Sequence, residues 1–203
     1  MKILTALPLL AALAIAAPLA AHAEDDGIDP VKAKAFDNSV FAGPIGDKAF
    51  ACFVRHYDAS HLAQHRKQKV TAMKLLVTAE NHPGEPTSYA YKAGFQLRNR
   101  PGNFDGGSSC GHMVDEDGTK EISFTCDIEC GGGGLDIAMS KDNKSAIVHL
   151  EVIGVLDRKH PRHDELTLKG GTDDKVFRLD RVDNTECAEL MTGHKELASL
   201  QRK

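Results

Sequence analysis

The chain has 203 residues, of which 41% are apolar and 27% charged, with a formal net charge of −4 and no tryptophan. A chain of this length can bury one sizeable hydrophobic core. The acidic balance argues against a nucleic-acid-binding protein, whose surface is basic, and the moderate apolar content argues against an integral membrane protein.

Residues 1–23 have the pattern of a secretory signal peptide. Lys2 precedes an alanine- and leucine-rich run, which ends in the small-residue motif Ala21-His22-Ala23. This pattern predicts cleavage before Glu24, a periplasmic or secreted protein, and no stable membrane span after cleavage. The alternative is a retained membrane anchor, which Pro8 and Pro18 disfavour.

Residues 24–46 show no clear hydrophobic period and are interpreted as a flexible leader, with a short turn of helix near 31–36. Residues 47–203 are predicted to form a single β-rich domain. Its clearest strand is 120–130, where Ile122, Phe124 and Cys126 alternate with polar residues, as in a strand with one buried face. Further strands are predicted over 88–98, 146–156, 49–55, 69–79, 108–114, 135–140, 165–168 and 175–182.

The segments between these strands are rich in turn-forming residues. They are 81–86, 100–103, 117–118, 141–143 and 170–174. Short strands separated by such turns favour antiparallel pairing. We therefore expect a mainly β fold, an antiparallel barrel or sandwich of about eight to nine strands.

Two segments have helical character. Residues 58–68 predict a short helix or ordered loop, and 184–200 predict a C-terminal helix, because apolar residues recur there at the helical period. A series of strands followed by one helix resembles the layout of the lipocalin-like barrels. The resemblance is architectural, since the chain has no lipocalin signature motif and lacks the tryptophan usual near the first strand of that family.

Five cysteines follow the predicted cleavage site: Cys52, Cys110, Cys126, Cys130 and Cys187. An oxidising compartment favours disulfides, and an odd number allows two intrachain bridges at most. Spacing does not choose the pairs. It disfavours Cys126 with Cys130, because four residues of extended strand span about 13 Å, more than a disulfide allows.

The leading functional hypothesis is a non-catalytic binding or interaction protein whose partner is an unknown small molecule or protein. Aromatic side chains on one strand face could line a site for a small apolar ligand: they are Tyr89, Tyr91, Phe95 and Phe124. The alternative is that these aromatic residues only fill the core. No catalytic residue and no cofactor are expected under this hypothesis.

A second hypothesis is a metal-handling protein. His61 and His65 would share one face of a helix over 58–68, and His56 could supply a third imidazole for zinc or copper. The alternative is a solvated polar loop, because H-x-x-x-H occurs often by chance.

A weaker hypothesis is a thiol-based or hydrolytic enzyme that uses Cys110 and His112, which would share a strand face. In an oxidising compartment, a disulfide at Cys110 is the alternative.

The basic loop 158–163 could capture an anion, although Asp164 and Glu165 follow it and favour a solvated turn.

Overall fold

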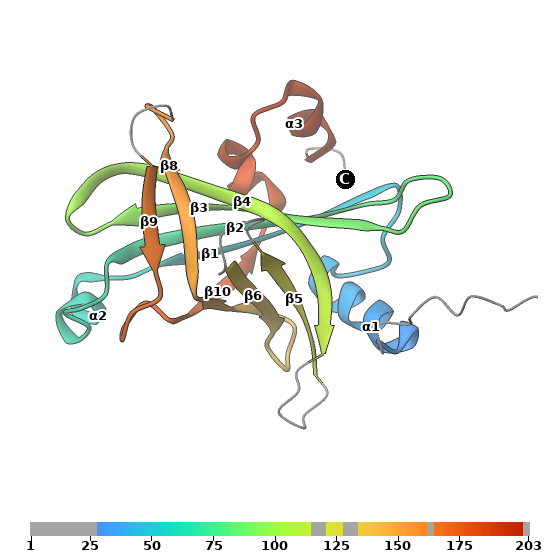
Figure 1. Ribbon diagram of the computed structural model, residues 1–203, viewed down its shortest axis with the longest axis horizontal. Coiled ribbons are helices and arrows are strands. Elements are labelled where there is room, and N and C mark those ends of the chain that lie inside the picture. The colour runs from blue at the N-terminus through green and yellow to red at the C-terminus, as the bar shows by residue number, and fades with distance from the viewer. Residues whose placement is uncertain (1–27, 115–120, 128–133, 162–164, 201–203) are drawn as a thin grey trace, which may run out of the picture.

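A computed structural model describes residues 28–114, 121–127, 134–161 and 165–200. The predicted signal peptide, the turn at 117–118, Cys130 and the end of the basic loop lie outside these residues. The described chain is mainly β, as the alternating sequence patterns predicted (Figure 1). The strands are β1 (Lys48–His56), β2 (Val70–Glu80), β3 (Ser88–Leu97), β4 (Arg100–Val114), β5 (Ile122–Asp127), β6 (Gly134–Met139), β7 (Ser145–Leu150), β8 (Val152–Asp157), β9 (Glu165–Lys169) and β10 (Val176–Val182).

Eight of these strands close into an antiparallel barrel. Their order is β3-β2-β1-β10-β7-β6-β5-β4, and β4 pairs again with β3. The hairpin of β8 and β9 is attached to the barrel through the pairing of β8 with the first part of β4. The predicted fold class is therefore confirmed.

The barrel interior is filled with side chains. In β1, Ala51 and Phe53 belong to the main core, whereas Cys52 between them belongs to a second cluster on the outer face. This is the two-residue alternation of a strand covered on both faces. The largest fully buried side chains in the core include five phenylalanines: Phe53, Phe95, Phe104, Phe124 and Phe177.

Strand β4 is long because it serves several partners. Along one edge it pairs with β3 from Arg100 to Cys110, and along the other it pairs first with β8 and then with β5. Two glycines allow the close approach of these strands. A Cβ atom at Gly106 would lie 3.0 Å from the carbonyl oxygen of Gly154, and one at Gly107 would lie 2.7 Å from that of Tyr91.

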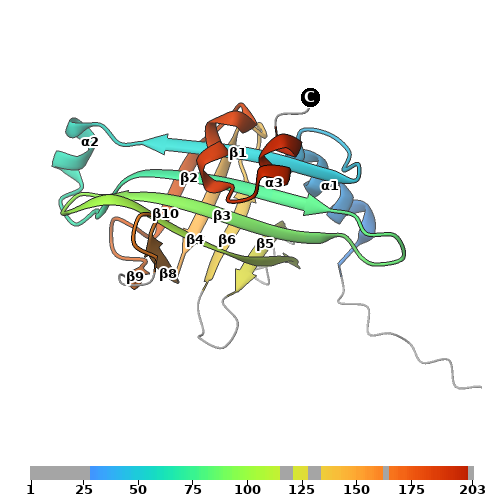
Figure 2. The ribbon, with the colours of Figure 1, turned by 90° about the horizontal axis from the view of Figure 1, so that it is seen from above.

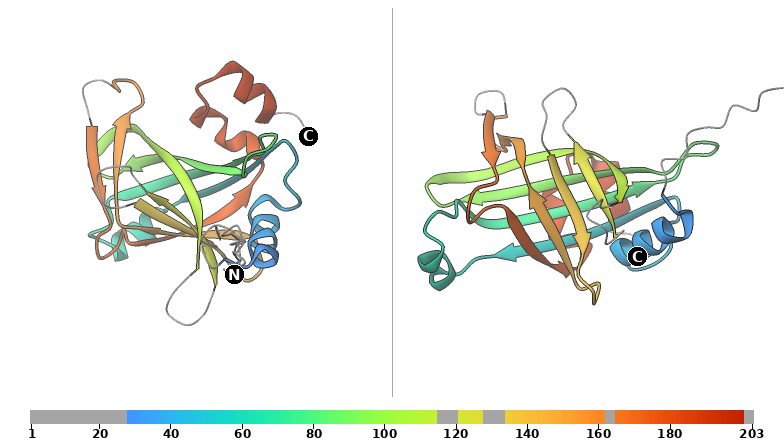
Figure 3. Two further views of the ribbon diagram at one scale, coloured as in Figure 1. Left: turned by 45° about the vertical axis from the view of Figure 1, so that its right-hand side comes forward. Right: turned by 60° about the horizontal axis from the view of Figure 1, so that its bottom comes forward.

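A helix lies at each end of the barrel (Figures 1 and 3). Helix α1 (Pro30–Phe41) begins after Asp29, whose carboxylate accepts a hydrogen bond from the Val31 N–H at 2.8 Å, and has proline in its first turn. Helix α2 (Ala59–Gln64) begins after Asp58, whose carboxylate accepts from the His61 N–H at 2.7 Å. The short helix predicted within 58–68 is present.

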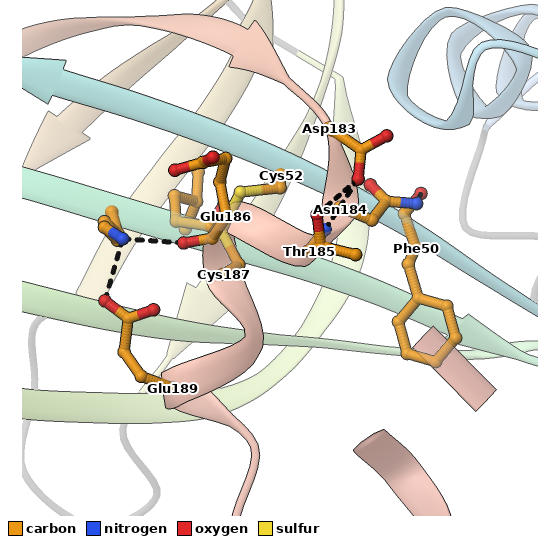
Figure 4. Close-up of a disulfide and its surroundings, with 10 residues drawn as sticks. Phe50, Cys52, Asp183, Asn184, Thr185, Glu186, Cys187 and Glu189 are labelled. Atoms are coloured by element: carbon orange, nitrogen blue, oxygen red, sulfur yellow. Dashed lines mark hydrogen bonds and ion pairs between the residues drawn. A yellow bond between two sulfur atoms is a disulfide. The ribbon is translucent and has the colours of Figure 1, made fainter. Parts of the chain in front are cut away.

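The C-terminal segment forms η1 (Asn184–Leu190), a 3₁₀ helix, and α3 (His194–Leu200). Both lie over the outer face of the first strands (Figure 2). Cys187 bonds to Cys52 of β1 across 135 residues (Figure 4). Around this bridge, Leu76, Leu190 and Leu200 form the second apolar cluster.

Figure 4 also shows how polar contacts hold η1. The Lys74 ammonium donates to the Glu186 carbonyl oxygen at 2.6 Å and pairs with the Glu189 carboxylate at 2.8 Å. Asp183 caps the start of η1 by accepting from the Thr185 N–H at 3.0 Å. The disulfide and these contacts fix the position of η1 on the barrel.

Four local predictions were wrong in detail. The leader contains a twelve-residue helix rather than a short turn, because α1 buries Val40 against the barrel. The single helix predicted over 184–200 is interrupted after Leu190. The strand predicted over 146–156 is divided at Glu151, where β7 ends and β8 turns toward β4. The turn predicted at 100–103 is strand, and the chain reverses just before it.

Two disulfides occur among the described residues, Cys52–Cys187 and Cys110–Cys126. The second joins neighbouring strands, so the prediction against a Cys126–Cys130 bridge is confirmed. Two bridges are typical of a non-reducing, extracytoplasmic compartment. Among the described helices, none is long and apolar enough to cross a membrane.

Candidate functional site

A groove with a volume of about 520 Å³ lies on the outer face of the barrel. Its floor is formed by β3 and β4, and the two sides are β8 and the C-terminal segment, which rise on either side of these strands in Figure 1. The lining residues are Ala90, Tyr91, Lys92, Ala93, Asp105, Gly106, Gly107, Ser108, Gly154, Leu156, Leu190 and Thr192. We call this site the β3–β4 groove.

Small residues keep the groove open. Gly106 and Gly107 lie where a side chain would meet neighbouring backbone, so the floor has no large side chain at these positions. Leu156 on one side is 39% exposed, whereas Leu190 on the other is buried against the second apolar cluster. The groove therefore offers an apolar surface that the described residues leave exposed.

Charged groups flank this apolar surface. Arg158 donates from Nε and Nη2 to the two carboxylate oxygens of Asp105, each at 2.7 Å. The Lys92 ammonium on the groove floor pairs with Glu196 of α3 at 3.3 Å. The paired hydrogen bonds from Arg158 to Asp105 raise the pKa of the guanidinium above its ordinary value, against the opposing effect of burial.

Arg158 belongs to the basic loop for which the sequence offered two interpretations. The guanidinium does hold an anion, but that anion is the protein's own Asp105, which is 53 residues away in the sequence. Its bidentate geometry fixes the start of the loop against β4. Arg158 therefore has a structural role: it holds Asp105, which lines the groove, and its guanidinium is not a free anion receptor.

The predicted aromatic residues lie mainly inside the barrel. Tyr91, Phe95 and Phe124 are buried in the main core, and Tyr89 packs against it. Burial raises the pKa of Tyr91 to about 12. Tyr91 also lines the groove. These placements support the core-filling interpretation more than an aromatic-lined interior site.

Tyr89 belongs to a polar cluster beneath α1. The buried Asp37 carboxylate accepts hydrogen bonds from the Tyr89 hydroxyl and from His112 Nε2, each at 2.8 Å. The rings of His112, Phe36 and Phe124 enclose the cluster, with ring centroids between 4.9 and 6.0 Å apart. Burial, and then the nearby Asp37 carboxylate, raise the pKa of Tyr89. Sequence reasoning missed Asp37, although the Asp29-Pro30 cap was a signal for its helix.

The three predicted metal ligands lie near α2, but their arrangement is that of packed rings. His61 stacks on His65 with centroids 4.3 Å apart, and its Nε2 lies 2.9 Å from the Gln68 side-chain oxygen. His56 is at the exposed end of β1. Within the described ranges, no three His, Cys, Asp or Glu side chains are grouped to hold a metal ion. Zinc or copper binding stays a prediction.

The structure does not bring a free thiol next to His112, as the enzyme hypothesis would require. Cys110 is bonded to Cys126, so its sulfur is not a thiol in this structure. His112 is directed to Asp37 rather than to a sulfur atom, with the 2.8 Å contact on Nε2. Cys110 and His112 therefore serve as a crosslink and a helix contact.

The comparisons with known proteins add no family. No family model matches the chain, and neither the curated proteins nor the solved structures contain a significant match.

Proposed function

We propose that this protein is a non-catalytic binding protein, exported to the periplasm or the medium, that holds a small amphipathic molecule in the β3–β4 groove. The observation that carries the proposal is the apolar groove of about 520 Å³ that the described residues leave exposed beside charged groups. This volume lies within the range of roughly 300–1,000 Å³ that is usual for small-molecule sites.

Export is supported by two independent features. The predicted signal peptide directs the chain across a membrane, and two disulfides suit an oxidising compartment. The filled interior supports a site on the outside of the barrel, because a ligand inside it would have to displace buried phenylalanines.

An amphipathic ligand suits the chemistry of the groove. Its apolar part would cover Leu156 and the small side chains of the floor, which removes apolar surface from water. Its polar part would lie near Lys92 or at the rim formed by Thr192. The barrel supplies a rigid floor, so little conformational entropy is lost on binding.

The test is native mass spectrometry of the protein purified under non-denaturing conditions, compared with its denatured mass. A bound molecule is expected as a mass difference, and Ala90→Phe should abolish it, because phenylalanine on the groove floor occupies the ligand volume. The matched control is Ala63→Phe on α2, where the native residue is exposed.

Binding of the dye anilinonaphthalene sulfonate gives a second readout. We expect weaker dye fluorescence for Ala90→Phe than for Ala63→Phe. Equal dye binding by the two variants, together with the absence of any co-purified mass, would contradict the proposal.

A further inference from the structure

A second cavity, of about 350 Å³, lies at the α2 end of the barrel and is lined by five basic residues. Arg66, Lys67 and Lys69 come from the loop between α2 and β2. Arg98 lies in the turn between β3 and β4, and Arg100 is the first residue of β4. Gln68, Leu97 and Asn99 complete the lining. We call it the basic pocket. It is separate from the β3–β4 groove, since the two share no lining residue.

Strand pairing brings the two basic segments together. Val70 at the start of β2 pairs with Leu97 at the end of β3. Beyond this pair, the Arg98 N–H donates to the Lys69 carbonyl oxygen at 2.8 Å. The antiparallel hairpin therefore brings basic residues that are about 30 positions apart in sequence to the same pocket.

The nearby carboxylates are engaged by the backbone rather than by these cations. Asp174, which is 1% exposed, accepts from the N–H groups of Lys69 at 2.7 Å and Val70 at 3.1 Å. Asp173 accepts from the Lys67 N–H at 3.0 Å. Among the residues that the structure describes, the side chains of Arg66, Lys67 and Lys69 have no ion-pair partner.

Arg98 is held in place without a carboxylate. Its Nη2 donates to the carbonyl oxygens of Leu62 at 2.7 Å and His65 at 3.2 Å, which ties the turn to α2. Its Nε is buried and has no hydrogen-bond partner in the described structure. A buried donor of this kind is costly unless a ligand or solvent satisfies it.

We infer that the basic pocket binds a phosphate oxyanion, either of a soluble phosphate ester or of an anionic phospholipid headgroup. Like charges held close together repel, and a bound anion relieves this repulsion. Arginine and lysine side chains supply the donors that phosphate oxygens prefer. The local charge is opposite to the net charge of the chain, so it belongs to this site and not to the surface as a whole.

The test uses inorganic pyrophosphate in calorimetric titration, and vesicles of phosphatidylglycerol with phosphatidylcholine against vesicles of phosphatidylcholine alone. The pocket variant is Arg66→Gln/Lys69→Gln. The control is Lys141→Gln/Lys144→Gln in the exposed turn between β6 and β7, which removes the same charge. Thermal unfolding verifies that each variant folds, and Lys67→Gln is a milder second variant.

We expect the pocket variant to lose affinity by roughly tenfold or more, because two charged donors are removed, while the control stays near the unmodified protein. Saturable pyrophosphate binding with this pattern supports a soluble phosphate ester. The same pattern with phosphatidylglycerol vesicles alone supports a lipid headgroup. Equal losses in the pocket and control variants, or saturable binding of neither probe, would overturn the inference.

Discussion

The charged side chains at the two ends of the barrel differ in sign and in their partners. At the α1 end, the Asp37 carboxylate is buried and accepts hydrogen bonds from Tyr89 and His112. At the α2 end, basic side chains surround a pocket, while the neighbouring carboxylates bind backbone N–H groups. Figure 1 shows these helices at opposite ends of the barrel. At the α1 end, the charged group has hydrogen-bond partners within the protein, whereas at the α2 end the basic side chains can bind an external anion.

The difference also concerns packing. Helix α1 buries Asp37 and Val40, and Arg181 donates to the carbonyl oxygens of Ser39 and Val40 at its C-terminal end, each at 2.7 Å. Helix α2 has six residues, none of them buried. A helix that buries side chains contributes to global stability, whereas an exposed short helix opens locally.

The largest effect is expected for Asp37→Ala. This substitution leaves the Tyr89 hydroxyl and His112 Nε2 without their shared acceptor in a buried site, so the free energy of unfolding should fall by about 3 kcal/mol. Urea denaturation measures it. Asp29→Ala, which removes only the cap of the same helix, is the control and should cost about 1 kcal/mol. A loss for Asp37→Ala no greater than the control would show that the cluster does not hold α1.

Tyr89→Phe should have an intermediate effect that depends on pH. Burial and the Asp37 carboxylate hold the pKa of Tyr89 above its ordinary value of 10.0 in the folded protein. The folded state therefore keeps this proton at pH values where the unfolded chain loses it. Its contribution to stability is complete below about pH 10 and is lost as the pH rises further.

Accordingly, Tyr89→Phe should lower stability at neutral pH by about 1–2 kcal/mol, through the lost hydrogen bond to a carboxylate. Its stability should also decline less steeply than that of the unmodified protein above about pH 10. Denaturant unfolding over a pH series measures both effects. Unchanged steepness would indicate that Tyr89 ionises as freely in the folded protein as in the unfolded chain.

The smallest effect is expected at the other end, for Asp58→Ala. Loss of the α2 cap should cost about 1 kcal/mol within the helix, while the global free energy of unfolding changes less, because α2 buries no residue. Amide hydrogen exchange should accelerate in Ala59–Gln64 and stay unchanged in α1. A global loss as large as that of Asp37→Ala would remove the distinction between the two ends.

The fold was predictable because each strand carries its own pattern. Ile122, Phe124 and Cys126 alternate with polar residues, and this pattern can be recognised without the rest of the chain. Such local periodicity was enough to predict an antiparallel barrel or sandwich. Helix α1 was underestimated because its apolar contacts are few. Its fixed position depends on contacts that are distant in sequence: Asp37 bonds Tyr89, 52 residues away, and Arg181 is at least 141 residues from the α1 carbonyl groups to which it donates.

Neither candidate site could be predicted from local sequence. The Asp105-Gly106-Gly107 segment is typical of a loop, and its place in β4 depends on pairing with β3 and the approach of β8. The basic pocket combines two segments of ordinary surface composition, which only the β2–β3 register brings together. Such sites depend on tertiary contacts rather than on motif spacing.

The Cys52–Cys187 bridge has a consequence for the order of assembly. A chain is synthesised from its N-terminus, so β1 and β2 are complete long before β10, the other neighbour of β1, exists. The barrel cannot close until residue 182 is available, and the bridge follows five residues later along the chain. This disulfide therefore forms late in assembly. It links β1 covalently to the C-terminal segment and stabilises a barrel that hydrogen bonds between strands have already closed.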